Sequence, residues 1–166
     1  MNADGENERN LLVSNGSDWG CNAISNGGNA RNYGWRTLTD AEWVYLLSTR
    51  KVQGKTGNGN TAVWTTLDND ISGLIIYHDD YVGSTTGLTE IPDGCVFLPT
   101  TGMRSTATYI GALSNARYWS STNRGASGDN IGYAHYASFS SSSFIPSSSG
   151  NLHRYYGNSV RLVYDK

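Results

Sequence analysis

The sequence predicts a single domain in which one short helix accompanies several short strands and a long, polar C-terminal half. Three observations lead to this prediction. A capping-box spacing, followed by apolar residues at helical intervals, marks a helix that starts near residue 40. Short apolar runs bounded by Gly, Asn and Pro mark the strands. Between Tyr118 and Tyr156 the chain is rich in Ser, Asn, Tyr and Gly, a composition typical of functional loops held on a rigid scaffold.

Composition and charge argue against two classes of partner. The chain has 166 residues, enough for one domain with a sizeable core. Only 16% of the residues are charged, the formal net charge is −2, and the longest basic grouping is Arg50-Lys51, so we expect no nucleic-acid partner. No apolar run approaches the roughly 20 residues that a membrane span needs, so we expect no direct membrane insertion.

The N-terminus is expected to differ from the rest of the chain. Residues 1–13 are predicted to form an N-terminal arm or a first strand, and Leu11-Leu12-Val13 is the apolar run that would open that strand. The first ten residues are acidic and polar and lack the basic and apolar regions of a signal peptide. Residues 14–166 are predicted to form one domain.

The clearest local signal is the helix start. Thr39 and Glu42 have the spacing of a capping box, in which each side chain binds the backbone N–H of the other residue. We expect a helix from about Asp40 to Ser48, with Trp43 and Leu47 facing the core. The spacing favours Glu42 as a cap over Glu42 as a catalytic carboxylate.

The expected strands are short and separated by turn-forming residues. Gln53–Asn60 is a predicted turn or hairpin tip, Thr101–Arg104 is a predicted turn, and Tyr81–Asp93 is a predicted loop. The predicted strands are Thr61–Thr66, Gly73–Tyr77, Cys95–Pro99, the stretch that begins at Gly132, and Ser159–Tyr164, of which Gly73–Tyr77 and Cys95–Pro99 are expected to be buried.

The strand after Gly132 has two different faces. Because side chains alternate along a strand, Ala137 and Phe139 are expected to face the core, whereas Tyr136, Ser138 and Ser140 face solvent or a ligand. The Ser-rich stretch that follows contains Phe144-Ile145-Pro146, which a flexible linker would not need. We expect it to form a second short strand or an ordered loop antiparallel to the first.

Two further groups contain residue types that can form chemical sites. His78-Asp79-Asp80 carries the right side chains for a metal site or for acid–base chemistry, but a solvated strand end is favoured because no second cluster completes a site. Cys21 and Cys95 are too far apart in sequence for a Cys-x-x-Cys site. Two buried, reduced thiols are favoured, with a disulfide as the alternative. No metal or cofactor is expected.

Four segments together resemble a known family of domains. They are Trp35-Arg36-x-Leu38-Thr39-x-Ala41-Glu42-Trp43, Val96-Phe97-Leu98-Pro99-x-x-Gly102-x-Arg104, Tyr118-Trp119-Ser120-Ser121 and Gly157-x-Ser159-Val160-Arg161-Leu162-Val163. Over roughly residues 18–163 the chain resembles FISUMP-type domains, which are similar to the C-type-lectin fold of formylglycine-generating enzymes. It also resembles the variable proteins of diversity-generating retroelements.

The resemblance implies an α+β domain with a C-type-lectin-like fold: small antiparallel sheets, one or two helices and a long, loop-rich C-terminal half. It implies that Trp35, Trp43, Trp119, Arg161 and the turn at Gly102 hold the scaffold. It also implies a variable region at residues 117–163, whose Asn, Ser, Tyr and His are the residue types that adenine-directed mutagenesis produces. The alternative is that Ser and Asn are there as ordinary loop residues.

The resulting hypothesis is a non-enzymatic, receptor-binding or adhesin-like module. A Tyr/Ser/Asn surface suits recognition, because Tyr gives rigid contact area and Ser and Asn give adaptable hydrogen bonds. The partner would be a protein or glycan on another cell or virion, and the protein would be extracellular, on a bacterial cell surface or a phage virion. The expected binding residues are Tyr118, Asn123, Arg124, Tyr136, Ser138, Ser140, Ser143, Ile145, Ser147, His153 and Tyr156.

Three alternative functions differ in the residues that they require. An enzyme of the formylglycine-generating type would need a late cysteine pair, yet no cysteine follows Cys95. Calcium-dependent sugar binding would draw on Asp79, Asp80, Glu90 and Asp93, which show no lectin calcium motif. A structural surface protein is the remaining alternative.

Overall fold

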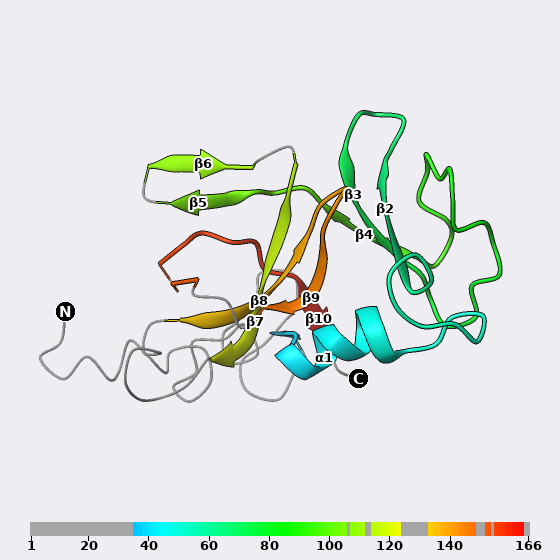
Figure 1. The fold of residues 1–166 in the computed structure, drawn as a ribbon, viewed down its shortest axis with the longest axis horizontal. Helices are drawn as coiled ribbons and strands as arrows, with labels where there is room; N and C mark the ends of the chain where they lie inside the picture. Colours follow the sequence, from blue (N-terminus) through cyan, green and yellow to red (C-terminus); the bar gives the residue numbers. More distant parts are fainter. Residues whose placement is uncertain are drawn as a thin grey trace, which may run out of the picture.

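The structure is a computed structural model that describes residues 35–105, 107–111, 114–123, 133–148, 152–153 and 155–164. It consists mainly of small antiparallel sheets with one short helix, an α+β arrangement (Figure 1). The elements are β1 (Trp35–Thr37), α1 (Asp40–Val44), the π-helical turn η2 (Tyr45–Thr49), β2 (Ala62–Thr66), β3 (Ser72–Ile76), β4 (Val96–Pro99), β5 (Met103–Ser105), β6 (Thr108–Ile110), β7 (Ala116–Asn123), β8 (Ala134–Phe139), β9 (Phe144–Ser148) and β10 (Leu162–Tyr164). Residues 1–34, with Leu11–Val13 and Cys21, lie outside the described residues.

The predicted capping box is confirmed. The Glu42 backbone N–H donates to Thr39 Oγ1 at 3.2 Å, and the Thr39 N–H donates to Glu42 Oε2 at 2.8 Å. Arg36 adds a contact that the spacing did not predict, donating to Glu42 Oε2 at 2.7 Å and pairing with Oε1. The helix runs close to its predicted length, but its second half is a π turn rather than α-helix. Trp43 and Leu47 are fully buried, as predicted.

A three-stranded antiparallel sheet, in the order β2-β3-β4, forms one side of the domain. β3 is central and buried, as the run Gly73–Tyr77 predicts. β4 is an edge strand in which only Leu98 is buried, so the expectation of a buried strand was wrong for most of it. An edge position also accommodates Pro99, which has no N–H to donate. The predicted turn at Thr101–Arg104 is only partly a turn, because β5 begins at Met103.

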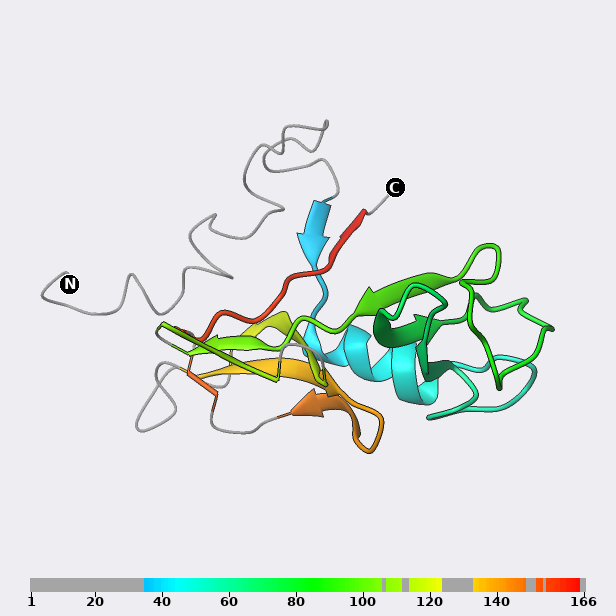
Figure 2. The ribbon, with the colours of Figure 1, turned by 90° about the horizontal axis from the view of Figure 1, so that it is seen from above.

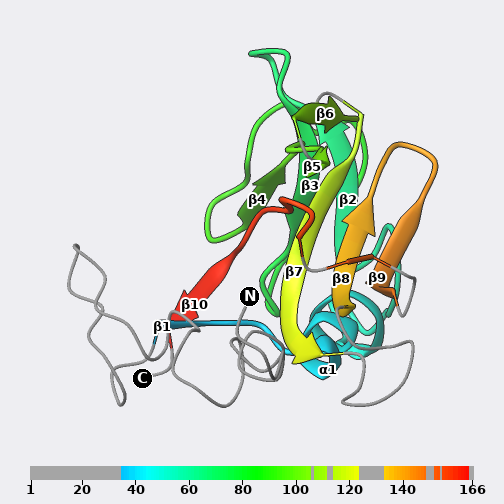
Figure 3. The same cartoon turned by 90° about the vertical axis from the view of Figure 1, so that its left-hand side faces the viewer.

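A second three-stranded antiparallel sheet, in the order β7-β8-β9, stands over the helix (Figure 3). β9 confirms the predicted strand that pairs antiparallel to β8. Its register slips by one residue, because Tyr136 and Ser138 of β8 pair with Ser148 and Ile145 of β9. This extra residue in β9 is a β-bulge, a feature that redirects a side chain.

The last described strand lies beside the first. β1 and β10 pair antiparallel, with Arg36 opposite Val163, and lie side by side in Figure 2. Before β10, the Trp119 N–H donates to Ser159 O at 2.9 Å, which places the incoming chain along the free edge of β7. The C-terminal strand predicted from Ser159 therefore begins as an isolated bridge and becomes a regular strand only at Leu162.

The main core lies between the helix and the two three-stranded sheets. Trp43 is its centre, packing against Tyr118 and Phe139 with ring centroids 6.1 and 6.4 Å apart. A smaller cluster under the long loop contains Tyr77 and Tyr81, whose rings stack at 4.4 Å, and Cys95 is half-buried against it.

The residues assigned to the scaffold by resemblance have different environments. Gly102 is buried at a φ of +57°, a conformation that favours glycine and fits the expected turn. Trp119 is half-buried and Arg161 is exposed. The side chain of Trp35 lies outside the described part. Within the described ranges, no helix is long and apolar enough to cross a bilayer.

Candidate functional site

The β7-β8-β9 sheet has one face in the core and one face turned away from it. Along β7, Ala116, Tyr118 and Ser120 are buried, and the residues between them are half-buried. Along β8, Ala137 and Phe139 are buried, as predicted. The opposite side carries the residues that we call the outer face: Arg117, Trp119, Tyr136, Ser138 and Ile145.

Strand pairing brings the outer-face residues into two cross-strand rows. Trp119 is directly opposite Tyr136, and Arg117 is opposite Ser138, which is in turn opposite Ile145. Side chains that face one another across a strand pair lie about 5 Å apart at Cβ and contact each other. The five residues therefore form one continuous surface although they come from three strands.

An aromatic pair and a cation form the centre of this face. The rings of Trp119 and Tyr136 meet edge to face, with centroids 6.1 Å apart and an angle of 86° between planes. The Arg117 guanidinium lies 5.9 Å from the Tyr136 ring centroid, within the range of a cation–π interaction. Arg117 also contacts the Met103 sulfur of β5. These contacts hold the side chains in place without removing them from solvent.

The helix holds the same sheet from behind. The Trp43 indole N–H donates to Trp119 O at 3.4 Å, and the Asp40 N–H donates to Thr122 Oγ1 at 2.9 Å. The Ser121 N–H donates to Leu38 O at 2.9 Å. The backbone that carries the outer face is therefore tied to the core.

A second group, which we call the aromatic cluster, consists of Tyr133, His153, Tyr155 and Tyr156. The His153 ring stacks between Tyr133, at 4.2 Å, and Tyr155, at 4.8 Å. Tyr155 also lies 4.8 Å from Tyr156, whose hydrogen bond raises the pKa of Tyr155. Tyr155 is 67% exposed, so the cluster presents aromatic surface to solvent.

The aromatic cluster adjoins the start of β8. Tyr133 forms a bridge with His153, and the Ala134 N–H donates to Leu152 O at 3.3 Å. Tyr133 immediately precedes β8, so the aromatic cluster lies at the end of the strand that carries Tyr136 and Ser138. The outer face and the aromatic cluster are the two parts of the candidate site.

The structure brings together many of the predicted binding residues. Tyr136, Ser138 and Ile145 lie on the outer face, and His153 and Tyr156 lie in the aromatic cluster. Ser140 and Ser143 close the β8–β9 hairpin, where the Ser140 N–H donates to Ser143 O at 2.8 Å. Arg124 and the side chain of Asn123 lie outside the described part of the chain.

The assignment of Tyr118 to a binding surface needs correction. Its side chain is 3% exposed and packs in the main core. Its hydroxyl donates to Pro99 O at 2.9 Å, and burial raises its pKa to about 12, while the nearby Arg161 acts in the opposite direction. The reason is the two-residue alternation of β7, which turns Tyr118 inward with Ala116 and Ser120.

Ser147 also differs from the prediction. The bulge in β9 directs it toward the helix, where its hydroxyl donates to Asp40 Oδ1. His135 Nδ1 lies 3.2 Å from the same oxygen. Serine, histidine and aspartate thus meet, but serine and histidine each contact the carboxylate. A serine nucleophile instead needs the imidazole to take its proton. The trio therefore has the geometry of a structural link between β8, β9 and α1.

Four residues of the candidate site were not among the predicted binding residues: Arg117, Trp119, Tyr133 and Tyr155. A signal for two of them was present. Arg117 is two residues from Trp119, and a cation on one side of a strand marks that side as the outward one. Tyr133 and Tyr155 depend on how the chain returns after residue 150, which no local pattern encodes.

His78-Asp79-Asp80 follows the end of β3, and both aspartates are exposed, as the favoured solvated strand end predicts. Asp79 pairs with Arg50, which is 7% exposed and also donates to Tyr77 O at 2.7 Å and Leu46 O at 3.2 Å. In the parts of the chain that the structure describes, no group of three or more His, Cys, Asp or Glu side chains has the arrangement of a metal site.

The chain was compared with protein-family models, curated proteins and solved structures. No family model, no curated protein and no solved structure matches the chain.

Proposed function

We propose that the protein is a non-enzymatic binding module that recognises a protein or glycan on another cell or virion. The outer face and the aromatic cluster form the recognition surface. The observation that carries the proposal is the group of half-buried side chains Arg117, Trp119 and Tyr136 on a sheet whose other face packs in the main core.

The rigidity of this surface supports binding. Tyr136 is held by Trp119 and Arg117, and β7 is tied to the helix by backbone and side-chain hydrogen bonds. Little side-chain entropy is then lost on association, which favours affinity. Tyr, Trp and Arg are also the residue types that contribute most to binding energy at protein interfaces.

The chemistry of the surface suits an uncharged or weakly acidic ligand. Aromatic rings and serine hydroxyls predominate, and Arg117 is the cation of the outer face. Exposed aromatic rings offer flat apolar area with polar edges, which fits the apolar faces of sugar rings as well as protein side chains. We therefore propose a protein or glycan ligand and no nucleic acid.

The C-type-lectin-like fold, the extracellular site of action and the diversification of residues 117–163 belong to the same proposal. Their support is the sequence resemblance together with the α+β arrangement of small antiparallel sheets. A formylglycine-generating activity is disfavoured because no cysteine follows Cys95. A serine-nucleophile activity is disfavoured as well, because Ser147 and His135 each contact Asp40 and the imidazole is not placed to take the serine proton.

The test is a binding screen that compares three forms of the protein. Three forms are applied to arrays of glycans and of purified bacterial surface proteins. They are the wild type, an outer-face variant (Tyr136→Ser, Ser138→Lys, Ile145→Lys) and a control variant (Tyr45→Ser, Val82→Lys). The control changes exposed apolar residues on η2 and on the long loop after β3, outside the sheet. We expect wild type and control to bind the same ligand and the outer-face variant to lose it. Equal binding by all three forms would refute the proposed surface.

A further inference from the structure

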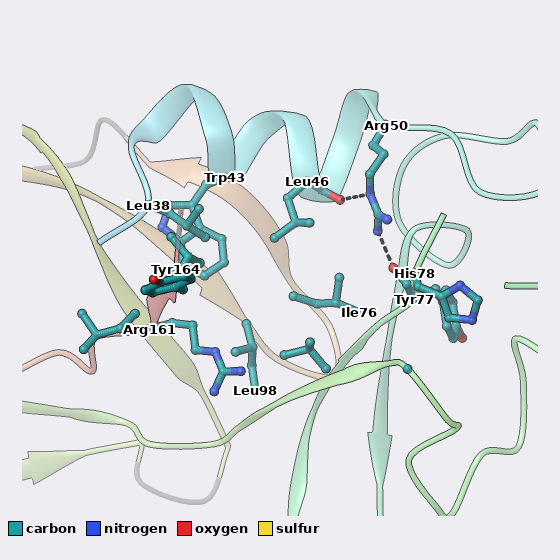
Figure 4. Close-up of a pocket in the computed structure, with 14 residues that line it drawn as sticks. Leu38, Trp43, Leu46, Arg50, Ile76, Tyr77, His78, Leu98, Arg161 and Tyr164 are labelled. Atoms are coloured by element: carbon teal, nitrogen blue, oxygen red, sulfur yellow. Dashed lines mark hydrogen bonds between the residues drawn. The ribbon is translucent and has the colours of Figure 1, made fainter. Parts of the chain in front are cut away.

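An apolar cleft lies between the helix and strands β3, β4 and β10, and none of the outer-face residues lines it (Figure 4). It has a volume of about 520 Å³, within the roughly 300–1,000 Å³ typical of small-molecule sites. Leu46 and Ile76 lie on its walls, and Leu98 and Leu162 line it from β4 and β10. A cleft of this size and lining suits the hydrocarbon part of a small ligand.

The described lining residues include two arginines and no acidic side chain. Arg50 is already satisfied, because it pairs with Asp79 and donates to the carbonyl oxygens of Leu46 and Tyr77. It stabilises the end of the helical segment rather than offering a charge to a ligand.

Arg161 differs from Arg50 in exposure and in partners. It lies immediately before β10, it is exposed, and its side chain extends beside Leu98 (Figure 4). No carboxylate of the described residues pairs with it. A guanidinium next to an apolar wall is suited to a carboxylate, which it can bind through two parallel hydrogen bonds.

We propose that this cleft binds a small amphipathic carboxylate, with the hydrocarbon chain between the helix and β3–β4 and the carboxylate on Arg161. The charge complementarity of Arg161 selects the anionic head, and the apolar walls select the chain. This site is separate from the recognition surface described above, so either proposal can fail without the other.

The test measures binding of octanoate to the full chain by isothermal titration calorimetry. The uncharged 1-octanol and the cationic octylammonium have the same chain and a different head. Hexanoate and decanoate have shorter and longer hydrocarbon chains than octanoate. Each added methylene that is fully buried should raise the affinity by about fourfold. Arg161→Gln removes the cation, and Lys55→Gln removes a positive charge from an exposed loop away from the cleft. Val96→Glu places a negative charge at the partly exposed strand edge that lines the cleft.

We expect saturable binding of one octanoate, weakened about tenfold by Arg161→Gln and abolished by Val96→Glu, with Lys55→Gln behaving as wild type. Octanol should bind more weakly than octanoate and should not respond to Arg161→Gln. Absence of saturable binding, or equal affinity for octanoate, octanol and octylammonium, would overturn the proposal. An apparent affinity for octanoate that falls as protein concentration rises would show that a second copy of the chain competes for the cleft. This result would also overturn the proposal.

Discussion

Phe139 and Tyr136 lie on one strand and face opposite sides of the sheet, so their substitutions should separate folding from recognition. Phe139 is 1% exposed, and its ring lies 6.4 Å from Trp43 and 5.7 Å from Phe144. Phe139→Ala removes these contacts and leaves a cavity, which typically costs about 3–5 kcal/mol. Tyr136→Ser leaves the core intact and removes the edge-to-face contact with Trp119, worth about 0.5–1.5 kcal/mol. It also removes the cation–π contact with Arg117, worth about 0.5–1 kcal/mol.

Urea titration followed by far-UV circular dichroism measures both changes. The midpoint should fall strongly for Phe139→Ala and slightly for Tyr136→Ser, with the same denaturant dependence in each. Phe139→Leu, a smaller perturbation, keeps the comparison possible where the alanine variant does not fold. A Tyr136→Ser variant that loses more than about 3 kcal/mol while Phe139→Leu matches the wild type would refute the assignment of the two faces.

Three further predictions concern the scaffold. Thr39→Ala should lower the free energy of unfolding by about 1 kcal/mol through loss of the helix cap, and an unchanged urea midpoint would contradict the capping role. The hydrogen bond from Arg36 holds the pKa of Glu42 at about 2, below its ordinary value of 4.5. The stabilisation that the ionised Glu42 carboxylate gives to the folded protein is therefore present above pH 4.5 and is lost as pH falls toward 2. It should amount to about 1–2 kcal/mol once the partial exposure of the carboxylate is taken into account, and Glu42→Gln should lack this acid dependence in thermal melts. Tyr118→Phe should cost about 1 kcal/mol through loss of the bond to Pro99 O and leave ligand affinity unchanged, whereas a selective loss of affinity would return Tyr118 to the binding surface.

Local sequence signals predicted the helix start and most strands because those features depend on neighbouring residues. The Thr39–Glu42 spacing is itself the cap, and the alternation of Ala137 and Phe139 with Tyr136 and Ser138 is itself the two-sided strand. Arg36 was not predicted as a partner of Glu42, since that contact depends on how β1 enters the helix.

The candidate site was predicted less well, because its members depend on register and on long-range return of the chain. Because β9 contains a one-residue bulge, Ser147 faces the helix and contacts Asp40, whereas the sequence predicted it on the binding surface. In β7 both Tyr118 and Trp119 are aromatic, so hydrophobicity alone did not reveal which one faces inward. His153 and Tyr155 join Tyr133 only because residues 152–156 fold back onto the start of β8.

The recognition surface is tested most directly by two matched tyrosine substitutions. Tyr155 of the aromatic cluster is 67% exposed, and Tyr45 of η2 is 59% exposed, so each Tyr→Ser change removes a similar exposed ring. Tyr45→Ser should alter stability by no more than about 0.5 kcal/mol. Tyr155→Ser should cost about 0.5–1.5 kcal/mol for each ring contact that it removes, with His153 and with Tyr156, and thermal melts of both variants verify that each remains folded. Affinity for the ligand identified on the arrays is then measured by surface plasmon resonance. Tyr155→Ser should weaken binding by about tenfold or more, with Tyr45→Ser equal to wild type; equal affinities for all three forms would contradict a recognition surface that includes the aromatic cluster.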